Sequence, residues 1–514
     1  MMDYDKITEH VGEMGKYHMC VYVLVLLPSV FVGMNMLSNV FNSASPKHRC
    51  FITDCDNSSS SFMESWVSSC IPESNKTEFN QCQQYEIISN SSYDHCPPLS
   101  NTNHLVFCDK WKYDDSVYES TVVTTWNLVC DDSWLAPLSG SLWMVGVIIG
   151  AVVFGDLSDR FGRRKIIIFS IFLFNITGFI VPFSVNYEMF LVVRIVEAAA
   201  TTGIYQTGFV VGQSKRVFCG TGINFAFAFG EALLGAMAYF IRDWRNLQFY
   251  LAVPNVMLIP ESARWLIAQG RTNEARTLIK KIAVFNNTFV PMDLLDDDLG
   301  TDLDQSNVTL HLHSTSSTRS SRKVTVLHLF MNTVGYYGIS MNATNLQGNV
   351  YVDFILTSLV EFPAYIFCLL VMNRLGRKKP LVGCMLIGGL SCVCTVFVPE
   401  DAKYQWISIG LSLIGKFGSA AAFAIVYVFS IELFPTVLRN NGIGLSSTFA
   451  HIGGVLAPYI ASFSSYGRAV PLLIFGLSSL LAGCFAMFLP ETLHQKLPET
   501  VDDAENFGRR EKED

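Results

Sequence analysis

Long apolar runs recur along the whole chain and are separated by short polar segments. A helix needs about 20 apolar residues to cross about 30 Å of hydrocarbon. The runs lie at residues 19–41, 138–154, 166–185, 190–211, 221–241, 247–259, 324–341, 350–372, 381–398, 406–434, 442–463 and 471–489, and those at 247–259 and 324–341 are the weakest. The pattern predicts an all-α membrane protein with twelve transmembrane helices.

The composition agrees with a membrane protein. The 514 residues are 50% hydrophobic and only 16% charged, whereas soluble domains carry about 25% charged residues. This excludes a soluble enzyme, a nucleic-acid-binding protein and a disordered protein. The sequence also lacks a nucleophile–base set, a metal cluster and a cofactor loop, so we expect no enzyme activity, no metal and no cofactor.

One polar segment, residues 43–133, interrupts the apolar pattern. Between positions 43 and 132 it holds 13 Asp and Glu against 5 Lys and Arg, and therefore the whole net charge of −8, together with 7 of the 14 cysteines. Clustered cysteines with glycosylation sequons indicate a disulfide-bonded, glycosylated extracellular loop. The disulfide candidates are Cys50, Cys55, Cys70, Cys82, Cys96, Cys108 and Cys130, which leave at least one thiol over, and the sequons begin at Asn57, Asn75 and Asn90.

Basic residues set the expected orientation, because Lys and Arg favour cytoplasmic connections. They concentrate after the second, sixth and eighth runs, so both termini and the long central loop are predicted to be cytoplasmic. The predicted parts are a cytoplasmic N-terminus (1–18), helix 1 (19–42), the extracellular loop (43–133), helices 2–6 (134–260), a cytoplasmic linker (261–323), helices 7–12 (324–490) and a cytoplasmic tail (491–514). Within the linker, 286–321 is predicted to be disordered.

The two six-helix halves repeat a basic turn. Gly155-Asp-Leu-Ser-Asp-Arg-Phe-Gly-Arg-Arg-Lys165 follows the second run, and Asn373-Arg-Leu-Gly-Arg-Lys-Lys379 follows the eighth. A duplicated six-helix unit is typical of transporters that bind substrate between the halves near mid-membrane. The glycines permit a tight turn, and the bases can pair with acids at other helix ends in one conformation only. The alternative is that these bases only fix the topology.

These motifs resemble the major facilitator superfamily and, more narrowly, the organic cation, carnitine and organic anion transporters (solute carrier family 22). The resemblance covers almost the whole chain, and the stretch 334–365 is most similar to the cation and carnitine branches. Its other motifs are Ser45-Pro-Lys-His-Arg-Cys50, Trp126-Asn-Leu-Val-Cys-Asp131, residues 238–245, Pro260-Glu-Ser-Ala-Arg-Trp-Leu266 and Glu432-Leu-Phe-Pro-Thr-Val-Leu-Arg439. The family implies the major facilitator fold and alternating-access transport of small charged organic molecules across a plasma membrane.

The motifs also suggest residues for conformational gating. They are Gly155, Asp159, Arg160, Gly162, Arg163, Arg164, Arg194, Glu261, Glu432 and Arg439. Arg194 begins an Arg-x-x-x-Gly motif in which Ala198 replaces the glycine, and a structural pair with Glu197 is favoured over a substrate contact there.

Charged side chains inside predicted helices are costly to bury and mark candidate substrate contacts. Glu361 could attract a cation or could only pair with a neighbouring base. Lys416 could be the partner of Glu361 or contact an anion, and Glu231 could contact substrate or only form a structural pair. Tyrosine rings can hold a cation through cation–π contacts. Five tyrosines could line the cavity in this way, and for each of them packing is the alternative: Tyr205, Tyr336, Tyr337, Tyr365 and Tyr427. Tyr336 and Tyr337 are favoured, because they fall in a segment that matches the family.

His451 leaves the charge preference open. Cation transporters of the family usually have Asp at this place, and anion and carnitine transporters usually have Arg. A histidine is neutral or positive near neutral pH. The alternative is a histidine that only packs between helices.

The leading hypothesis is transport of small organic cations or zwitterions such as carnitine. The expected partners are the substrate and the lipid bilayer, and no nucleic acid is expected. Coupling to Na⁺ or H⁺ is left open. An organic anion transporter is the alternative, supported by Lys416 and by the lack of Asp at His451. A transport-inactive isoform or receptor-like relative is a second alternative, because helices 6 and 7 look shortened. The 13 residues of run 247–259 reach only about 20 Å.

Overall fold

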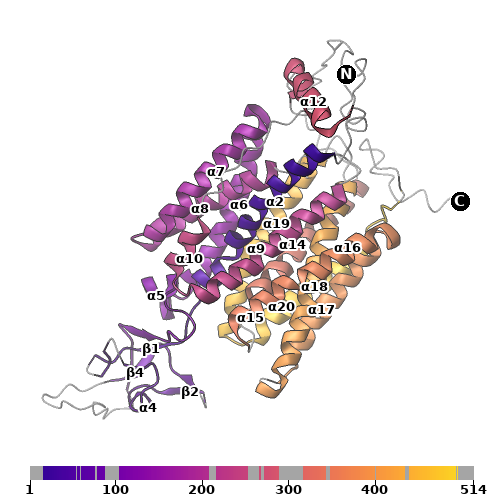
Figure 1. Cartoon of the computed structure of the whole chain (residues 1–514). Coiled ribbons are helices and arrows are strands. Elements are labelled where there is room, and N and C mark those ends of the chain that lie inside the picture. Colours follow the sequence, from indigo (N-terminus) through magenta and orange to yellow (C-terminus); the bar gives the residue numbers. More distant parts are fainter. Residues whose placement is uncertain are drawn as a thin grey trace.

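The computed structural model describes residues 15–53, 55–57, 60–75, 78–86, 104–207, 216–252, 266–267, 271–288, 316–342, 348–399, 401–433, 439–493 and 495. A bundle of long helices forms the body of the molecule, and a small domain containing the β-strands projects from one end (Figure 1). Helix α12 (Thr272–Asn286) lies at the opposite end, near the start of α2 (Figure 1).

The first half contains one helix for each of the first six apolar runs. They are α2 (Lys16–Leu37), continued by the short α3 (Asn39–Asn42), α6 (Leu135–Phe161), α7 (Arg163–Ile180), α8 (Tyr187–Thr207), α9 (Arg216–Phe240) and α10 (Trp244–Leu251). Helix α8 packs against α6 and α7, and α2 packs against α9.

The second half repeats this organisation. Its helices are α14 (Ser316–Asn342), α15 (Val350–Leu359), α16 (Glu361–Leu375), α17 (Lys378–Val396), α18 (Gln405–Leu433), α19 (Arg439–Ser462) and α20 (Ala469–Ala486). Helices α15 and α16 together form the eighth predicted run, divided at Val360. The halves meet where α6 packs against α19 and where α9 packs against α15 and α16.

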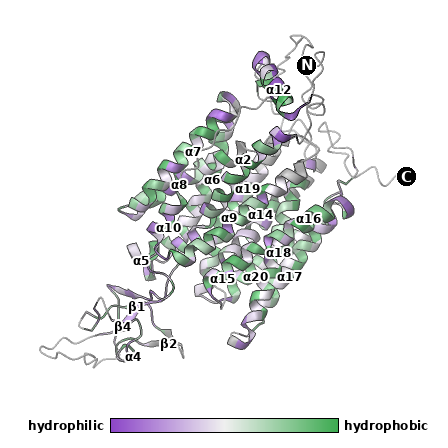
Figure 2. Ribbon diagram, viewed as in Figure 1, coloured by the Kyte–Doolittle hydropathy of each residue, from purple (hydrophilic) through white to green (hydrophobic). Residues whose placement is uncertain are grey.

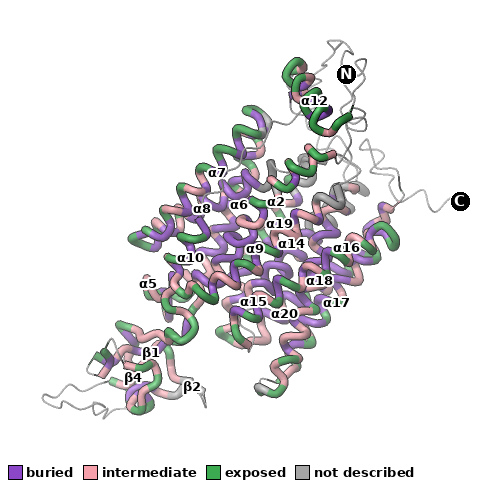
Figure 3. The backbone as a smooth tube through the Cα atoms, in the orientation of Figure 1, coloured by how far each residue is buried: buried purple, intermediate pink, exposed green. Residues whose placement is uncertain are grey.

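The outward faces of the helices are apolar and exposed, as lipid contact requires. On α7, Phe169 is 50% and Phe172 62% exposed, and Leu370 on α16 is 61% exposed. Figure 2 shows α7 as largely hydrophobic, and Figure 3 shows exposed stretches along the same helix. Within the described residues, eight helices are long and apolar enough to cross a bilayer. The chain is therefore a multi-pass membrane protein.

Two corresponding turns confirm the internal repeat. Gly162 joins α6 to α7 with φ 99°, and Gly376 joins α16 to α17 with φ 87°. A side chain would be strained at these angles, so the glycine in each basic motif has a backbone reason.

The structure corrects the prediction for the seventh helix. Helix α14 begins at Ser316, inside the predicted linker, and runs for 27 residues, or about 40 Å. The prediction that the linker stays irregular to position 321 is therefore wrong. The shortened apolar span of the seventh helix stays a prediction, because α14 is not among the eight described helices that are apolar enough to cross a bilayer. Polar residues form its first turns, and a search for apolar runs misses them. The sixth run remains open, because α10 ends at Leu251 and residues 253–265 lie outside the described part.

The projecting domain, residues 43–133, is called the loop domain below. Its strands are β1 (His48–Cys50), β2 (Glu73–Asn75), β3 (Glu78–Phe79), β4 (Gln83–Tyr85), β5 (Leu105–Phe107) and β6 (Trp111–Tyr113), and its helices are α4 (Val67–Cys70) and α5 (Val122–Trp126). The strands pair antiparallel as β1–β6, β2–β3 and β4–β5. Three two-stranded pairs are too small to fold unaided, so covalent links are expected to stabilise the domain.

Disulfides supply those links. Cys50 bonds to Cys108 and Cys82 to Cys130, and Cys55 is also disulfide-bonded. Cys70 is a buried free thiol, so its place among the disulfide candidates is corrected. Cys96 and Asn90, and the side chain of Asn75, lie outside the described part, whereas Asn57 is exposed.

A segment of the loop domain, residues 116–120, connects the two halves and is called the strap. Its Glu119 and Ser120 amides donate to the Arg242 carbonyl at 3.1 and 3.3 Å in the first half. In the second half, the Tyr351 hydroxyl donates to the Val117 carbonyl at 2.7 Å. The strap therefore touches both halves at the loop-domain end.

Candidate substrate-binding site

Lys416 and Glu361 form a buried ion pair inside the second half. Helix α18 carries Lys416 and α16 carries Glu361, and Nζ lies 2.5 Å from Oε1 with both side chains at 0% exposure. The ammonium also donates to Ser340 Oγ at 2.5 Å and lies 3.8 Å from the centre of the Tyr336 ring. A carboxylate, a hydroxyl and an aromatic face therefore hold the lysine.

Two tyrosines complete the surroundings of Glu361. The Tyr336 hydroxyl lies 2.9 and 3.1 Å from the two carboxylate oxygens. The Tyr365 hydroxyl, one turn along α16, donates to Oε2 at 2.6 Å. Both carboxylate oxygens of Glu361 therefore have hydroxyl donors within hydrogen-bond distance.

Glu231 brings the first half into the same cluster. It lies on α9 with 1% exposure, its Oε2 is 3.9 Å from Lys416 Nζ, and its Oε1 is 3.4 Å from the Tyr336 hydroxyl. We call Glu231, Tyr336, Glu361, Tyr365 and Lys416 the charged cluster. It crosses the interface between the halves in the interior of the bundle.

The charged cluster has more acid than base. Two carboxylates face one ammonium, so full ionisation leaves one negative charge without a partner. Removing such a charge from water costs several kcal/mol unless a counter-charge is supplied. One monovalent cation or one proton is enough to balance the cluster.

A row of aromatic rings leads from the charged cluster toward α19. Tyr336 stacks on Phe423 with 4.9 Å between ring centres, and Phe423 lies 5.1 Å from Tyr427. Tyr337 lies edge-on to Tyr336 with 5.2 Å between ring centres, and its hydroxyl contacts the sulfur of Met36. The side chain of Tyr205 lies outside the described part.

His451 stands apart from the charged cluster in the contacts that the described residues make. It lies on α19, where its Nε2 is 3.4 Å from Ser447 Oγ one turn away, and its buried Nδ1 has no hydrogen-bond partner. An unpaired buried nitrogen is uncommon in a residue that only packs. Its part in charge selection stays a prediction.

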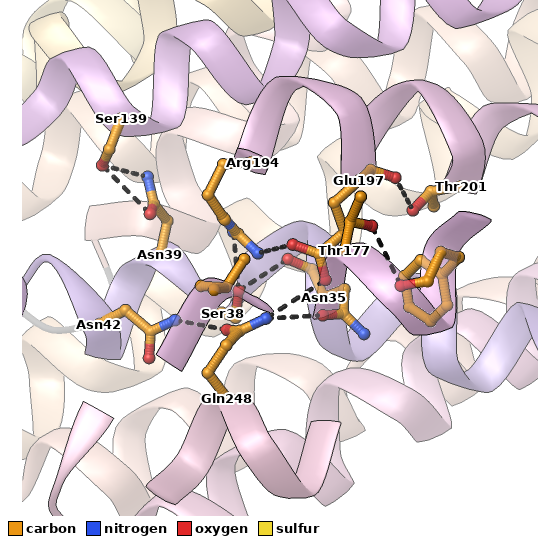
Figure 4. Close-up of polar contacts among 12 residues, drawn as sticks. Asn35, Ser38, Asn39, Asn42, Ser139, Thr177, Arg194, Glu197, Thr201 and Gln248 are labelled. Carbon is orange, nitrogen blue, oxygen red and sulfur yellow. Dashed lines mark hydrogen bonds and ion pairs between the residues drawn. The ribbon is translucent and has the colours of Figure 1, made fainter. Parts of the chain in front are cut away.

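A second polar network lies within the first half and joins α2, α8 and α10 (Figure 4). Arg194 pairs with Glu197 at 3.0 Å and donates to Ser38 Oγ at 3.0 Å. Gln248 donates to Glu197 Oε1 at 3.3 Å and accepts from Asn42 at 2.9 Å. The Arg194 guanidinium also lies 4.0 Å from the centre of a Trp143 ring. This network ties the short α10 to two longer helices.

The described gating candidates other than Arg194 lie at the bundle end opposite the loop domain (Figure 1). Arg160 Nε is 3.0 Å from Asp156 Oδ2 in the preceding turn, with both side chains exposed. Gly155 lies inside α6. The side chains of Asp159, Arg163 and Arg439, and all of Glu261, lie outside the described part, and Arg164 has partners of its own.

In the second half, the acids of the repeated motifs meet the basic turn. Arg377 Nη2 is 2.8 Å from Glu432 Oε1, and the Thr492 hydroxyl donates to Glu432 Oε2. Glu491 accepts from the backbone amides of Arg377 at 2.8 Å and Lys378 at 3.1 Å. Burial alone opposes ionisation of Glu491, but these amide bonds hold its pKa below the usual value. Glu432 is thus bonded to the turn between α16 and α17.

Several residues of these sites had no signal in the sequence. Ser340 and Gln248 are ordinary polar residues in apolar runs, and only helix packing reveals that they bond to charged groups. Arg377 lies in a recognised basic turn, but its partner Glu432 is far away in the chain.

In the loop domain, His48 lies near Cys82 and Cys130. Those two sulfurs form a disulfide, so the group does not fit a metal site.

Comparisons with known proteins agree with a transporter. The family described as "Sugar (and other) transporter" matches residues 99–503. The chain is 34% identical to a Drosophila melanogaster organic cation transporter protein, over 99% of this chain and 96% of that one. It is 36% identical to human organic cation/carnitine transporter 2, over 98% and 94%. It is 35% identical to mouse solute carrier family 22 member 4, over 98% and 94%.

Solved structures agree with the fold. The proton:xylose symporter XylE, a major facilitator superfamily protein, superposes with a TM-score of 0.61 over 96% of this chain and 98% of that one, at 15% identity. An inward-open form of the same xylose transporter from E. coli gives a TM-score of 0.58 at 14% identity. The expected fold, two six-helix halves of a major facilitator, is confirmed.

Proposed function

Because the chain belongs to the solute carrier 22 family of organic cation and carnitine transporters, within the major facilitator superfamily, we propose that it carries small organic cations or zwitterions of the carnitine type. Members of this superfamily work by alternating access. We further propose that it acts in the plasma membrane with both termini in the cytoplasm. The basic turns and α12 lie at the end opposite the loop domain (Figure 1), which supports that orientation.

The charged cluster supports a cationic substrate. Glu231 and Glu361 face the single base Lys416, all at 0–1% exposure. A quaternary or protonated amine supplies the missing positive charge, and a tyrosine ring such as that of Tyr337 can contact it through its face. The surplus of one negative charge at the interface of the halves is the observation that carries this proposal.

The same cluster makes an organic anion a weaker candidate. Lys416 is already paired with Glu361 and bonded to Ser340, so a monoanion would have to displace a carboxylate and leave it unpaired. A zwitterion adds no net charge and therefore costs less than a monoanion, because its carboxylate can compete for Lys416 while its ammonium approaches Glu231. Carnitine-like substrates therefore fit better than simple anions.

The halves are in contact at the loop-domain end. Ser141 on α6 donates to the Val455 carbonyl on α19 at 2.6 Å, and the rings of Phe41 and Tyr351 stack at 5.6 Å. Helix α6 follows the loop domain directly, so its first turns lie at that end. In alternating access, these contacts separate to admit substrate from the outside.

Uptake in transfected cells tests the proposal. Tetraethylammonium, carnitine and para-aminohippurate are supplied in parallel as labelled probes, and uptake is divided by the amount of protein at the cell surface. We expect saturable uptake of tetraethylammonium or carnitine, and little uptake of para-aminohippurate. Preferential uptake of para-aminohippurate would support the organic anion alternative, and surface protein that takes up none of the probes would support the inactive isoform.

A further inference from the structure

Helix α12 has a buried face and an exposed face that differ in composition. Its buried residues recur every three or four positions and are all apolar: Ala275, Ile279, Ile282 and Ala283. On the opposite face, Lys280 and Lys281 are exposed, and one turn further along Val284 is 76% and Phe285 52% exposed. Residues three or four apart lie side by side on a helix, so two ammonium groups adjoin two exposed apolar side chains. We call these four residues the basic face of α12, and Figure 3 shows α12 as mostly exposed.

The two lysines of the basic face have no acidic partner among the described residues. The other bases of the helix are engaged, because Arg271 pairs with Glu274 at 2.6 Å and Arg276 has partners of its own. The basic face therefore carries two positive charges that no acid in the described part of the chain offsets.

The first turn of α2 lies at the level of the lipid headgroups. An exposed apolar stripe runs along α2 with one residue in each turn, at Met19 (43% exposed), Val23 (50%) and Leu27 (48%), which is the surface expected of a helix that contacts lipid. Lys16 is exposed and begins the helix just before this stripe. A lysine at the end of a lipid-facing stripe places its ammonium among the headgroups.

Helix α12 is attached to α2 at this level. The Tyr17 amide in the first turn of α2 donates to Asn286 Oδ1 at 2.8 Å, and the rings of Tyr17 and Phe285 lie 5.9 Å apart, edge to face. Asn286 is the last residue of α12, so the end that carries Val284 and Phe285 is the end held beside α2. Figure 1 places both elements at the end of the bundle opposite the loop domain. The basic face therefore adjoins the bilayer surface at that end.

We propose that the basic face of α12 binds anionic phospholipids of the cytoplasmic leaflet. The ammonium groups of Lys280 and Lys281 pair with the phosphate or carboxylate groups of the lipids, and Val284 and Phe285 enter the boundary between headgroups and acyl chains. A free anion in solution would account for the lysines but not for the two apolar side chains beside them. The binding holds the linker between the halves against the bilayer next to α2. Only the choice of leaflet rests on the proposed orientation.

Chemical protection at position 284 tests the proposal. The full-length Val284→Cys chain is placed in nanodiscs of phosphatidylcholine, with or without phosphatidylserine as about a third of the lipid, and is modified by an uncharged polyethylene glycol maleimide that stays in water. Modification of the chain's own exposed cysteines is measured without the substitution and subtracted. We expect modification to be at least about fivefold slower with phosphatidylserine, the factor that one lysine near an anionic surface contributes. The difference should largely disappear in about 1 M salt, which screens the attraction.

Substitution of the two lysines shows whether they cause the protection. Lys280→Gln with Lys281→Gln removes both charges and should make the rates in the two lipids equal. The matched control, Lys110→Gln with Lys403→Gln, removes two exposed lysines at the loop-domain end and should keep the fivefold difference.

Two results would overturn the lipid-binding face. One is an equal rate of modification in both lipids at low salt while Lys280 and Lys281 are present. The other is protection by inorganic phosphate in phosphatidylcholine alone, because a soluble anion would then be the ligand. The comparison of lipids with both lysines present decides the matter whatever the lysine variants do. No transport is measured, so a failure of the proposed function in the uptake assay is a separate result.

Discussion

At the residue scale, the charge of Glu361 decides whether Lys416 can stay buried. Glu361→Gln removes the closest counter-charge from an ammonium at 0% exposure, and leaving a buried charge unpaired costs about 3–5 kcal/mol. Glu231, at 3.9 Å, is the remaining acid and becomes committed to the lysine. We therefore expect surface-normalised cation uptake to fall about tenfold or more while the surface level falls much less.

A double substitution separates packing from binding. Glu361→Gln with Lys416→Met removes both charges of the pair, and a neutral replacement of a buried ion pair is often tolerated. The double variant is expected to recover surface expression but not cation uptake. Equal losses of expression and uptake in the single variant, both recovered in the double variant, would show that the pair only supports the fold.

His451 is expected to tune the preference between cations and anions. His451→Asp adds a negative charge to α19 and His451→Arg adds a positive one, at a residue whose only polar contact shown is with Ser447. We expect the uptake ratio of tetraethylammonium to para-aminohippurate to rise at least about fivefold with Asp and to fall with Arg, which corresponds to roughly 1 kcal/mol. An unchanged ratio in both variants would remove His451 from the site.

The candidate site could be predicted only in part from the sequence. A charged residue in an apolar run is visible by itself, and Glu231, Glu361 and Lys416 were found in that way. Their mutual distances depend on how α9, α16 and α18 pack, and a single sequence does not contain those distances. Ser340 and Arg377 were missed as partners for this reason, because a serine in a helix and an arginine in a basic turn have many possible roles.

At the element scale, a buried ion pair supports β1 in the loop domain. Arg49 Nη1 and Nη2 donate to the two oxygens of Asp56 at 2.7 and 2.8 Å, and the Ile52 amide donates to Asp56 at 2.9 Å. Burial by itself raises the pKa of Asp56, but these bonds and the nearby arginine charge outweigh it and hold the pKa below the usual value. Both charges of the pair are at 0% exposure.

This shift predicts how the loop domain responds to acid. A carboxyl whose pKa is lower in the folded state stabilises the fold fully above its unfolded pKa, near 3.9, and loses that contribution as the pH falls through the folded pKa. Asp56→Asn is expected to cost about 3–5 kcal/mol at neutral pH, because Arg49 is left unpaired, and to weaken the acid dependence. Urea-dependent proteolysis of the loop domain in membranes measures both effects. The control is Asp109→Asn, which replaces an exposed acid and should change the free energy of unfolding by less than about 0.5 kcal/mol.

The helices themselves were largely predictable, since a bilayer imposes a minimum apolar length. The exceptions have a common cause. Helix α14 has polar first turns, so its hydropathy understates its 27 residues. Helix α10 has eight described residues, and Gln248 links it to α2 and α8 through hydrogen bonds that no apolar pattern reveals. Polar residues within a helix are thus where the prediction from hydropathy fails.

At the scale of the whole molecule, the strap offers a way to test the movement of the halves. Alternating access separates the halves at the loop-domain end, and the strap is bonded to both. Because two backbone amides of the strap bond to Arg242 and one side chain, Tyr351, bonds to Val117, the Tyr351 contact is the one expected to break on opening. A hydrogen bond of this kind contributes about 1 kcal/mol.

Tyr351→Phe keeps the ring that stacks on Phe41 and removes only the hydroxyl. We expect the population open at the loop-domain end to rise about fivefold, the equivalent of that 1 kcal/mol. Met144→Cys reports the opening, because Met144 is 1% exposed and contacts Gly454 of the other half. A membrane-impermeant maleimide should therefore modify this cysteine about fivefold faster in the Tyr351→Phe background. Tyr239→Phe is the control and should leave the rate of modification unchanged, because it alters a half-exposed tyrosine whose ring also meets Tyr351. Equal rates in the wild-type, Tyr351→Phe and Tyr239→Phe backgrounds would show that the strap moves with both halves and does not hold them together.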